Sequence, residues 1–315
     1  MKTQKIGGEK VLVSVKESDI VDGVFLCEEA TEIADGVLNR MPTLKKLVLP
    51  KVKKLGNYCL SSNDFLTTLD LPVCTTMGNH CLSSNASLTT LDLPVCTTMG
   101  NHCLSWNDFL TTLDLPVCTT MGNHCLSSND FLTTLDLPVC TTMGNDCLRW
   151  NASLTTVSFG NYKLSVKNVD GYCFVVEKEK TSKGIRIYTG YNLINVKDSV
   201  INKQECYVAE KENFTTHGET VKKAISDLNF KIVADKLKNE PIEKDTVFTV
   251  EKYRLITGAC DLGCRDWMQR NNIPFNITKE DKTIESAPIK AIDLLPLLRK
   301  SNAYGIDKIE SLITF

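Results

Sequence analysis

Cysteine and histidine recur at fixed spacing in the first half of the chain, and their side chains are the ligands that zinc prefers. The cysteines form four pairs at a spacing of 22 residues: Cys74/Cys81, Cys96/Cys103, Cys118/Cys125 and Cys140/Cys147. Three of these pairs have a histidine before the second cysteine: His80, His102 and His124. A zinc site gathers convergent ligands around one ion, whereas these residues form evenly spaced rows. We therefore interpret the cysteines as small apolar core residues and predict no metal site and no cofactor.

Two more cysteines, Cys260 and Cys264, lie one helical turn apart in the C-terminal third. A nucleophilic cysteine needs a base, and His217 is the single histidine after residue 124. Phosphate-binding loops and hydrolase nucleophile motifs are also missing. We therefore predict that the protein is not an enzyme. The alternative is a translocated effector or toxin whose activity lies in the C-terminal domain and rests on these two thiols.

Aspartate and threonine form rows with the same spacing. Between Leu66 and Leu148 the chain has no lysine or arginine, and seven aspartates give this stretch a charge of −7. Eight of the recurring residues are predicted to share one exposed strand face: Thr68, Asp70, Thr90, Asp92, Thr112, Asp114, Thr134 and Asp136. Like charges aligned about 4.8 Å apart destabilise a ladder unless water, a cation or a basic partner meets them. We predict that this face binds a partner; the alternatives are a solvated face without a partner and calcium bridging, which needs convergent carbonyl ligands.

Two tryptophans interrupt the otherwise similar copies. Trp106 and Trp150 stand where other copies have serine. An exposed tryptophan is a common anchor of protein interfaces, so we include both in the predicted partner-binding surface. The alternative is a ring that lies over a neighbouring loop. A row of asparagines in the same turns is expected to bond the turn backbone instead of a ligand: Asn63, Asn85, Asn107, Asn129 and Asn151.

These rows require a repeating scaffold. The segment LTTLDLPVCTTMGNHCLSSNAS at Leu66 recurs almost unchanged at Leu88, Leu110 and Leu132. A less similar copy begins at Leu44, and a degenerate copy precedes it. Apolar and polar residues alternate at the start of each copy, which predicts a strand, and a proline ends that strand. The later pair Cys81 and Leu82 is expected to form a turn of helix under the strand. One unit cannot bury its own apolar face, so stacking must supply the core.

The pattern LxxLxLPxCxxMGxxCL resembles the BspA-type bacterial leucine-rich repeat over residues 22–160. Cys74 matches the apolar residue after the family's proline, Met77 and Gly78 match its isoleucine-glycine pair, and Cys81 and Leu82 match its last pair. The resemblance implies an α/β leucine-rich-repeat solenoid with a parallel β ladder. It places both cysteine columns inside, so the adjacent histidines should point outward. The family consists largely of surface and interaction proteins, which implies a role in protein–protein interaction.

Composition shifts to lysine, glutamate and aromatic residues after Gly160. Two strands, at 171–178 and 184–189, and a third at 206–209 are expected to form a short β cap over the open edge of the solenoid. A small all-α domain of four or five helices should follow. Its helices are expected near 218–240, 245–256, 259–269, 291–299 and 304–312. Phrases such as SNAYGIDKIESLITF look similar to tails of uncharacterised bacterial and prophage-encoded repeat proteins, which implies no activity.

The domain boundaries follow from these patterns. We predict an N-terminal cap, the solenoid, a β-rich cap or linker and a helical C-terminal domain, at 1–21, 22–160, 161–212 and 213–315.

The net charge and the hydropathy of the sequence limit the classes of partner and the cellular location that we expect. A net charge of −2 and a pI near 6.1 give no overall attraction to nucleic acid or to an anionic membrane. The N-terminus lacks the apolar run of a signal peptide, and the sequence contains no run of about 18 apolar residues that could span a membrane. We therefore expect a cytoplasmic protein with reduced cysteines. The alternative is export by another route.

We predict a non-enzymatic interaction module of bacterial or phage origin that binds a protein partner. Self-association is a second option, because a basic cluster in the first full unit could meet the acidic solenoid head to tail: Lys45, Lys46, Lys51, Lys53 and Lys54.

Overall fold

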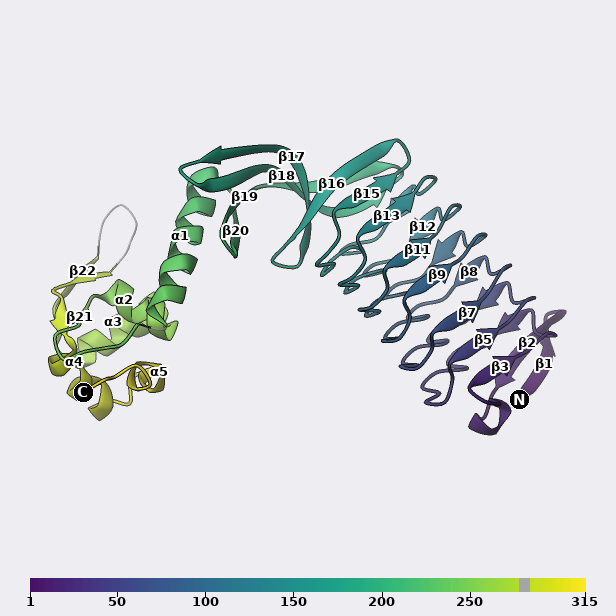
Figure 1. Cartoon of the computed structure of the whole chain (residues 1–315), viewed down its shortest axis with the longest axis horizontal. Helices are drawn as coiled ribbons and strands as arrows, with labels where there is room; N and C mark the ends of the chain where they lie inside the picture. The colour runs from purple at the N-terminus through teal and green to yellow at the C-terminus, as the bar shows by residue number, and fades with distance from the viewer. Residues whose placement is uncertain (239, 278–283) are drawn as a thin grey trace. The chain divides into compact units, whose positions relative to one another are not determined.

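The computed structural model describes residues 1–238, 240–277 and 284–315, and the chain forms two compact units. Unit 1 contains Met1–Lys211 and Thr215–Ala224. Unit 2 contains Glu212–Phe214 and Ile225–Phe315. Figure 1 labels the elements of both. No helix among the described residues is long and apolar enough to span a membrane.

Unit 1 starts with an antiparallel hairpin, β1 (Lys2–Ile6) and β2 (Glu9–Ser14), and a single 3-10 turn, η1 (Glu17–Asp19). Each 22-residue repeat then supplies two short strands. The first strands are β3 (Val24–Leu26), β5 (Lys46–Val48), β7 (Thr68–Asp70), β9 (Thr90–Asp92), β11 (Thr112–Asp114), β13 (Thr134–Leu137) and β15 (Thr156–Phe159). The second strands are β4 (Glu32–Ile33), β6 (Lys54–Leu55), β8 (Thr76–Met77), β10 (Thr98–Met99), β12 (Thr120–Met121) and β14 (Thr142–Met143).

The second strands of successive repeats pair in parallel and in register from β4 to β14, whereas the first strands pair in three groups, β3–β5–β7, β9–β11 and β13–β15. Thr90 pairs with Thr112 in the ladder of first strands, and Thr98 pairs with Thr76 and Thr120 in the ladder of second strands. In Figure 1 the coils from β3 to β15 lie one against the next. Every residue therefore lies beside its own equivalent 22 positions away, and a row in the sequence becomes a row on the surface.

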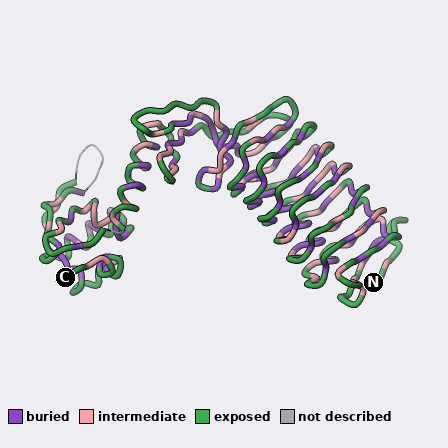
Figure 2. The backbone as a smooth tube through the Cα atoms, in the orientation of Figure 1, coloured by how far each residue is buried: buried purple, intermediate pink, exposed green. Residues whose placement is uncertain are grey.

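The core lies between the two ladders (Figure 2). Leu66, Leu71, Cys74, Met77 and Cys81 are all buried, as are their equivalents in the following repeats, and they belong to one continuous hydrophobic cluster. The stacked coils thus bury apolar faces that a single repeat would leave in water, as the repeat pattern predicts. The parallel β solenoid with 22-residue repeats is confirmed.

The predicted turn of helix at Cys81 and Leu82 is wrong. Both residues are buried, but they lie in a turn in which His80 and Leu82 have φ values of 56° and 55°. A right-handed helix needs negative φ at every residue, so alternating left-handed residues exclude it. The second strand, just before this turn, occupies the side of the coil where the helix was expected.

Successive coils approach so closely that glycine is required at one position. A Cβ atom on Gly122 would lie 2.5 Å from the backbone nitrogen of Asn101 in the previous coil. No real Cβ tolerates such a contact, and the obstacle is backbone, which cannot turn aside. Gly78, Gly100 and Gly144 meet equivalent obstacles.

An antiparallel cap covers the end of both ladders. It consists of β16 (Tyr162–Val169), β17 (Tyr172–Ser182), β18 (Ile185–Lys197), β19 (Val200–Lys211) and β20 (Phe214–Gly218). β16 pairs with β15 of the first ladder, and β18 pairs with β14 of the second through Met143 and Val196. The predicted capping is confirmed, with strands longer than expected and with β16 and β20 in addition.

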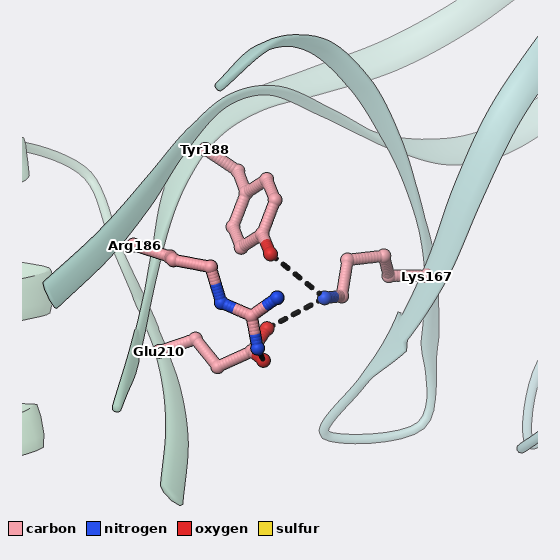
Figure 3. Close-up of polar contacts among 4 residues, drawn as sticks. All are labelled: Lys167, Arg186, Tyr188 and Glu210. Carbon is pink, nitrogen blue, oxygen red and sulfur yellow. Dashed lines mark hydrogen bonds and ion pairs between the residues drawn. The ribbon is translucent and has the colours of Figure 1, made fainter. Parts of the chain in front are cut away.

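A polar cluster ties three strands of the cap together (Figure 3). Lys167 of β16 donates to Glu210 of β19 at 2.5 Å and to the hydroxyl of Tyr188 of β18 at 3.1 Å. Arg186 of β18 forms a second ion pair with Glu210. Burial alone would raise the pKa of Glu210, but the hydrogen bond from Lys167 and the two positive charges hold it below its ordinary value.

Unit 2 contains five helices among its described residues: α1 (Val221–Leu237), whose first residues belong to unit 1, α2 (Val250–Thr257), α3 (Asp261–Arg270), α4 (Ala291–Lys300) and α5 (Ile306–Glu310). Each overlaps one of the predicted helices. Two small antiparallel pairs, which the all-α prediction did not include, accompany them: β21 (Val247–Phe248) with β24 (Ile289–Lys290), and β22 (Phe275–Ile277) with β23 (Ile284–Ser286). Strands of two or three residues are too short to show a period of two in the sequence.

Candidate functional site

The outer side of the first ladder carries the predicted rows of threonine and aspartate. We call these eight residues the acidic strand face; all are exposed: Thr68, Asp70, Thr90, Asp92, Thr112, Asp114, Thr134 and Asp136. The leucine between each threonine and aspartate, such as Leu91, points into the core. The alternation of a strand therefore presents one hydroxyl and one carboxylate from each coil on the same side.

The carboxylates of the acidic strand face are exposed to solvent. Within the described ranges, none of its four carboxylates forms an ion pair with lysine or arginine. Asp92 and Asp114 are direct neighbours in the ladder. The exposed Lys46 lies in register beside Thr68, so the face meets the basic cluster at its N-terminal side.

The two predicted tryptophans do not lie on the strands of this face. Both occupy turns that precede a first strand, with φ values of 61° and 58°. The ring of Trp150 covers Gly171 in the β16–β17 turn, since a Cβ there would lie 2.6 Å from the indole, and the Trp150 amide donates to the Gly171 carbonyl at 2.9 Å. For Trp150 the alternative of a ring over a neighbouring loop therefore applies. Trp106 is 59% exposed.

Phenylalanines three residues after the tryptophan position extend these turns into an aromatic edge, which the sequence reading missed. Phe65, Phe109 and Phe131 are all exposed, and the rings of Phe109 and Phe131 stack at 5.3 Å between centroids. We use aromatic edge for these three residues with Trp106 and Trp150. The signal was present as phenylalanine at one repeat position in three copies, but serine in the other copies concealed it.

The histidine row lines a groove on the turns after the second strands. The rings of Tyr58, His80, His102 and His124 stack with centroids 4.6, 4.6 and 4.8 Å apart. Burial, and then the neighbouring imidazoles, lower the pKa of His102 below its ordinary value of 6.5. The groove holds about 660 Å³, with Asp35 near one end and Asp146 near the other. The histidines are at the surface as predicted, but half-buried by their neighbours.

An asparagine ladder also lines this groove. The Asn79 amide nitrogen donates to Asn57 Oδ1 at 2.9 Å, and Asn101 and Asn123 continue the series at 2.8 Å. Because the imidazole planes are parallel, their nitrogens do not converge on one point. Across the described part of the chain, no group of three or more histidine, cysteine, aspartate or glutamate side chains is placed to hold a metal ion.

The second asparagine row is structural, as predicted. Asn107 is fully buried; its Nδ2 donates to the carbonyls of Leu82 and Leu104 at 2.9 Å, and its Oδ1 accepts from the Asn85 amide. These bonds satisfy backbone groups in the tight turns. The row offers nothing to a ligand.

Both cysteine columns belong to the core, which confirms that interpretation. Cys81 is fully buried and its thiol donates to the carbonyl of Gly56 at 2.8 Å. Burial raises the pKa of Cys74 to about 11 and that of Cys96 to about 12. Thiols held this far from the thiolate are poor nucleophiles and poor metal ligands.

Cys260 and Cys264 are placed differently. Cys260 is exposed at the N-cap of α3, where its sulfur accepts from the Gly263 amide at 3.4 Å, and Cys264 is buried one turn later. Both line a pocket of about 940 Å³ within unit 2. His217 belongs to unit 1, where Nδ1 lies 2.8 Å from Asp170 Oδ2. Unit 2 therefore contains no imidazole that could serve either thiol as a base.

Comparison with known proteins bears on the solenoid. A family model described as the BspA type leucine rich repeat region matches the chain in six copies, over residues 21–110 and 53–181. A search among curated protein sequences found no match.

Two solved structures are similar at low identity. A leucine rich cell surface protein from Faecalibacterium prausnitzii A2-165 is 18% identical with a TM-score of 0.42, over 56% of this chain and 50% of that one. The pneumococcal vaccine antigen PcpA is 16% identical with a TM-score of 0.43, over 55% of this chain and 51% of that one. The chain thus spans about half the length of these structures.

Proposed function

We propose, starting from the fact that this chain belongs to the BspA-type leucine-rich-repeat family, that it is a non-enzymatic module that holds a basic protein partner on its acidic strand face. Solenoids of this family are typically non-enzymatic, and leucine-rich-repeat proteins generally bind proteins. The observation that carries the proposal is the row of four exposed carboxylates, one from each of four successive coils, which form no ion pair with a described lysine or arginine; Asp92 and Asp114 lie side by side in register.

Electrostatics supports a basic partner in particular. Like charges on neighbouring strands destabilise a sheet, and the acidic strand face maintains this repulsion over four coils without an internal cation. A partner with lysine or arginine side chains would relieve it, and complementary charge would also steer the encounter. The flanking threonine hydroxyls can donate and accept hydrogen bonds, so the face offers directional contacts beside its charge.

Trp106 extends the proposed surface onto the aromatic edge. Its ring is the most exposed of the edge, and tryptophan is over-represented among residues that dominate binding energies. Ser84 and Ser128 occupy the equivalent positions with φ values of 59° and 58°, close to that of Trp106. Trp106→Ser therefore removes the anchor in a backbone conformation that serine already adopts in this solenoid.

Origin and location are part of the same proposal: a bacterial or phage protein that works with reduced cysteines, as in the cytoplasm. The support is that thirteen of the fourteen cysteines are buried free thiols that fill the core. Alkylation of the protein in intact cells, followed by its intact mass under non-reducing conditions, tests this. Fourteen cysteines recovered without disulfides are expected, and disulfide-linked cysteines in the native protein would contradict it.

A pair of double variants tests the binding face. Asp92→Asn/Asp114→Asn and Glu28→Gln/Glu179→Gln each remove two exposed carboxylates from unit 1. The first pair lies on the acidic strand face, and the second lies in the first coil and in β17 of the cap. Affinity purification from the native cell with quantitative mass spectrometry should show partners that the first variant loses and the second retains. Partners retained equally by both variants, or no protein partner for the full chain, would contradict the proposal.

A second candidate is an effector or toxin activity in unit 2, favoured by the exposed Cys260 at the rim of the pocket. Its test is the labelling rate of Cys260 by a thiol reagent at neutral pH. Labelling much faster than in an unstructured peptide of the same local sequence would support a reactive thiol. Equal or slower labelling would count against this activity.

A further inference from the structure

The pocket of unit 2 lies between two small hydrophobic clusters. One is built around Leu294 and Leu298 of α4, and the other around Cys264 and Met268 of α3. Tyr253 and Trp267 pack against both clusters and so form part of the wall between them. A volume of about 940 Å³ is in the range that binds small organic molecules in proteins.

The aromatic walls of this pocket present apolar surface to a ligand. Trp267 Nε1 donates to Ser301 Oγ at 2.7 Å, and the Tyr253 hydroxyl donates to the Tyr304 carbonyl at 2.6 Å. Burial raises the pKa of Tyr253 to about 12, so this hydroxyl stays neutral. With their polar atoms already bonded inside unit 2, both rings offer faces that gain most from contact with an apolar group.

The charged side chains that line the pocket among the described residues are both positive. They are Arg270 and Lys300, at the ends of α3 and α4. The Trp267–Ser301 bond joins the ends of these two helices. Among the described residues neither cation has a carboxylate partner within ion-pair distance.

We propose that this pocket binds a small anionic amphiphile, with its apolar body between α2, α3 and α4 and its acidic group at Arg270 and Lys300. An acid with a hydrocarbon or aromatic body satisfies both features: the walls exclude water from the body, and the two cations meet the charge. A cationic amphiphile would meet repulsion, and a neutral one would leave both cations without a partner. This site is separate from the acidic strand face and independent of the function proposed for it.

One glycine of the wall allows the pocket to be filled from within. Gly263 lines the pocket in the first turns of α3, and a Cβ there would meet only Cys260 Sγ, at 3.5 Å. Gly263→Leu should project its side chain into this space, and replacing a glycine inside a helix favours the helix. Gly263→Ala is the smaller version of the same change.

Two fluorescent probes with the same rings test the proposal on the full chain. 1-Anilinonaphthalene-8-sulfonate carries a negative charge, and N-phenyl-1-naphthylamine lacks it. We expect saturable binding of the anionic probe with one site, and its displacement by dodecanoate at lower concentration than by dodecanol. Arg270→Gln/Lys300→Gln should raise the Kd of the anionic probe about tenfold and change the Kd of the neutral probe by no more than about twofold. Gly263→Leu should weaken both probes about tenfold.

Control variants make each outcome decisive. Lys51→Gln/Lys53→Gln removes two exposed charges from unit 1 and should change neither probe. Circular dichroism and melting curves report whether Gly263→Leu remains folded, and Gly263→Ala provides a milder reduction of the pocket if it does not. If neither glycine variant changes the affinity of the probes, the probes do not bind in this pocket and the proposal is wrong. Equal loss of both probes in Arg270→Gln/Lys300→Gln would overturn the anionic preference.

Discussion

The solenoid and unit 2 are stabilised by contacts of different kinds. In the solenoid the contacts across a coil boundary recur from coil to coil at fixed separations. Asn79 bonds to Asn101 and His80 stacks on His102, 22 positions away in each case, and the thiol of Cys81 bonds to the carbonyl of Gly56, 25 positions away. In unit 2 each contact occurs once and joins unrelated positions, as between Tyr253 and Tyr304. Properties of the solenoid are therefore collective and tolerate the loss of a member, whereas unit 2 depends on individual contacts.

Removal of 22 residues should give the largest contrast. Deleting residues 88–109 removes one coil in register, so the coil of residues 66–87 can pack against the next equivalent coil and the solenoid should stay folded. Deleting residues 250–271 removes α2 and α3 and with them one hydrophobic cluster of unit 2. Melting curves and hydrogen exchange should show a protected solenoid in the first variant and an unprotected unit 2 in the second. Loss of the melting transition in the first deletion would refute the modular interpretation.

Glycine to alanine should have opposite effects in the two regions. Gly122→Ala places a methyl 2.5 Å from the Asn101 nitrogen and should destabilise the solenoid by about 3 kcal/mol, because the coils must separate. Gly263→Ala brings a methyl into ordinary van der Waals contact with Cys260 Sγ, at 3.5 Å, and should leave unit 2 unchanged or up to about 1 kcal/mol more stable. Urea unfolding with hydrogen exchange read separately on peptides from each unit measures both. Equal tolerance of the two substitutions would show that the coils can separate freely.

The ion pairs of the two regions should also differ. Glu210 in the cap is 12% exposed, whereas Glu310 in unit 2, bonded to Arg299, is 42% exposed. Lys167→Met should cost about 1–2 kcal/mol, and Arg299→Met less than about 1 kcal/mol. The experiment is chemical unfolding of both variants at neutral pH. Equal losses of stability in the two variants would mean that the burial of Glu210 does not strengthen its ion pair with Lys167.

The cap pair should also depend on pH. The folded pKa of Glu210 lies below the ordinary 4.5, so its contribution is present above that value and is lost as pH falls through the folded pKa. The stability difference between wild type and Glu210→Gln should therefore shrink under acid conditions. Unfolding measured at a series of pH values from neutral to acid reports it. A difference that stays constant across this series would contradict the lowered pKa.

Neutralising the acidic strand face should have the smallest effect on stability. Asp92→Asn/Asp114→Asn removes repulsion between neighbouring strands and should stabilise the solenoid by about 0.5 kcal/mol at low salt. High salt screens exposed charges, so the gain should vanish near 1 M salt. Melting temperatures at low and high salt measure it. A destabilised variant would show that these carboxylates support the fold instead of opposing it.

The two regions also differ in how far their sequence predicts them. In the solenoid the period indicates which residues of successive coils lie side by side, so the parallel ladder of first strands and the buried cysteines were predicted correctly. The second ladder, which contains Thr76 and Met77, was not predicted, because a strand of two residues shows no alternation. The turn at Cys81 and Leu82 was not predicted either, because the left-handed φ values of His80 and Leu82 leave no sign in the apolar pattern. The choice of Thr68, Asp70 and their equivalents as a binding surface stays a prediction.

In unit 2 the apolar period located the helices but not how they meet. The pocket depends on side chains more than 30 positions apart, such as Trp267 and Ser301, whose approach no local pattern reports. The proposed position of the anionic group, at Arg270 and Lys300, likewise depends on two helix ends that are far apart in the sequence.

The register between coils affects how the number of repeats can change in evolution. Because Asn79, His80 and Thr90 each contact their own equivalents, a coil fits against a copy of itself on both sides. Unequal recombination between the nearly identical gene segments would then yield chains with one coil more or fewer, each still able to fold. Every such event would lengthen or shorten the acidic strand face by about 4.8 Å and one carboxylate. The length and the charge of the acidic strand face can therefore change in evolution by one coil at a time, without a point mutation in any coil.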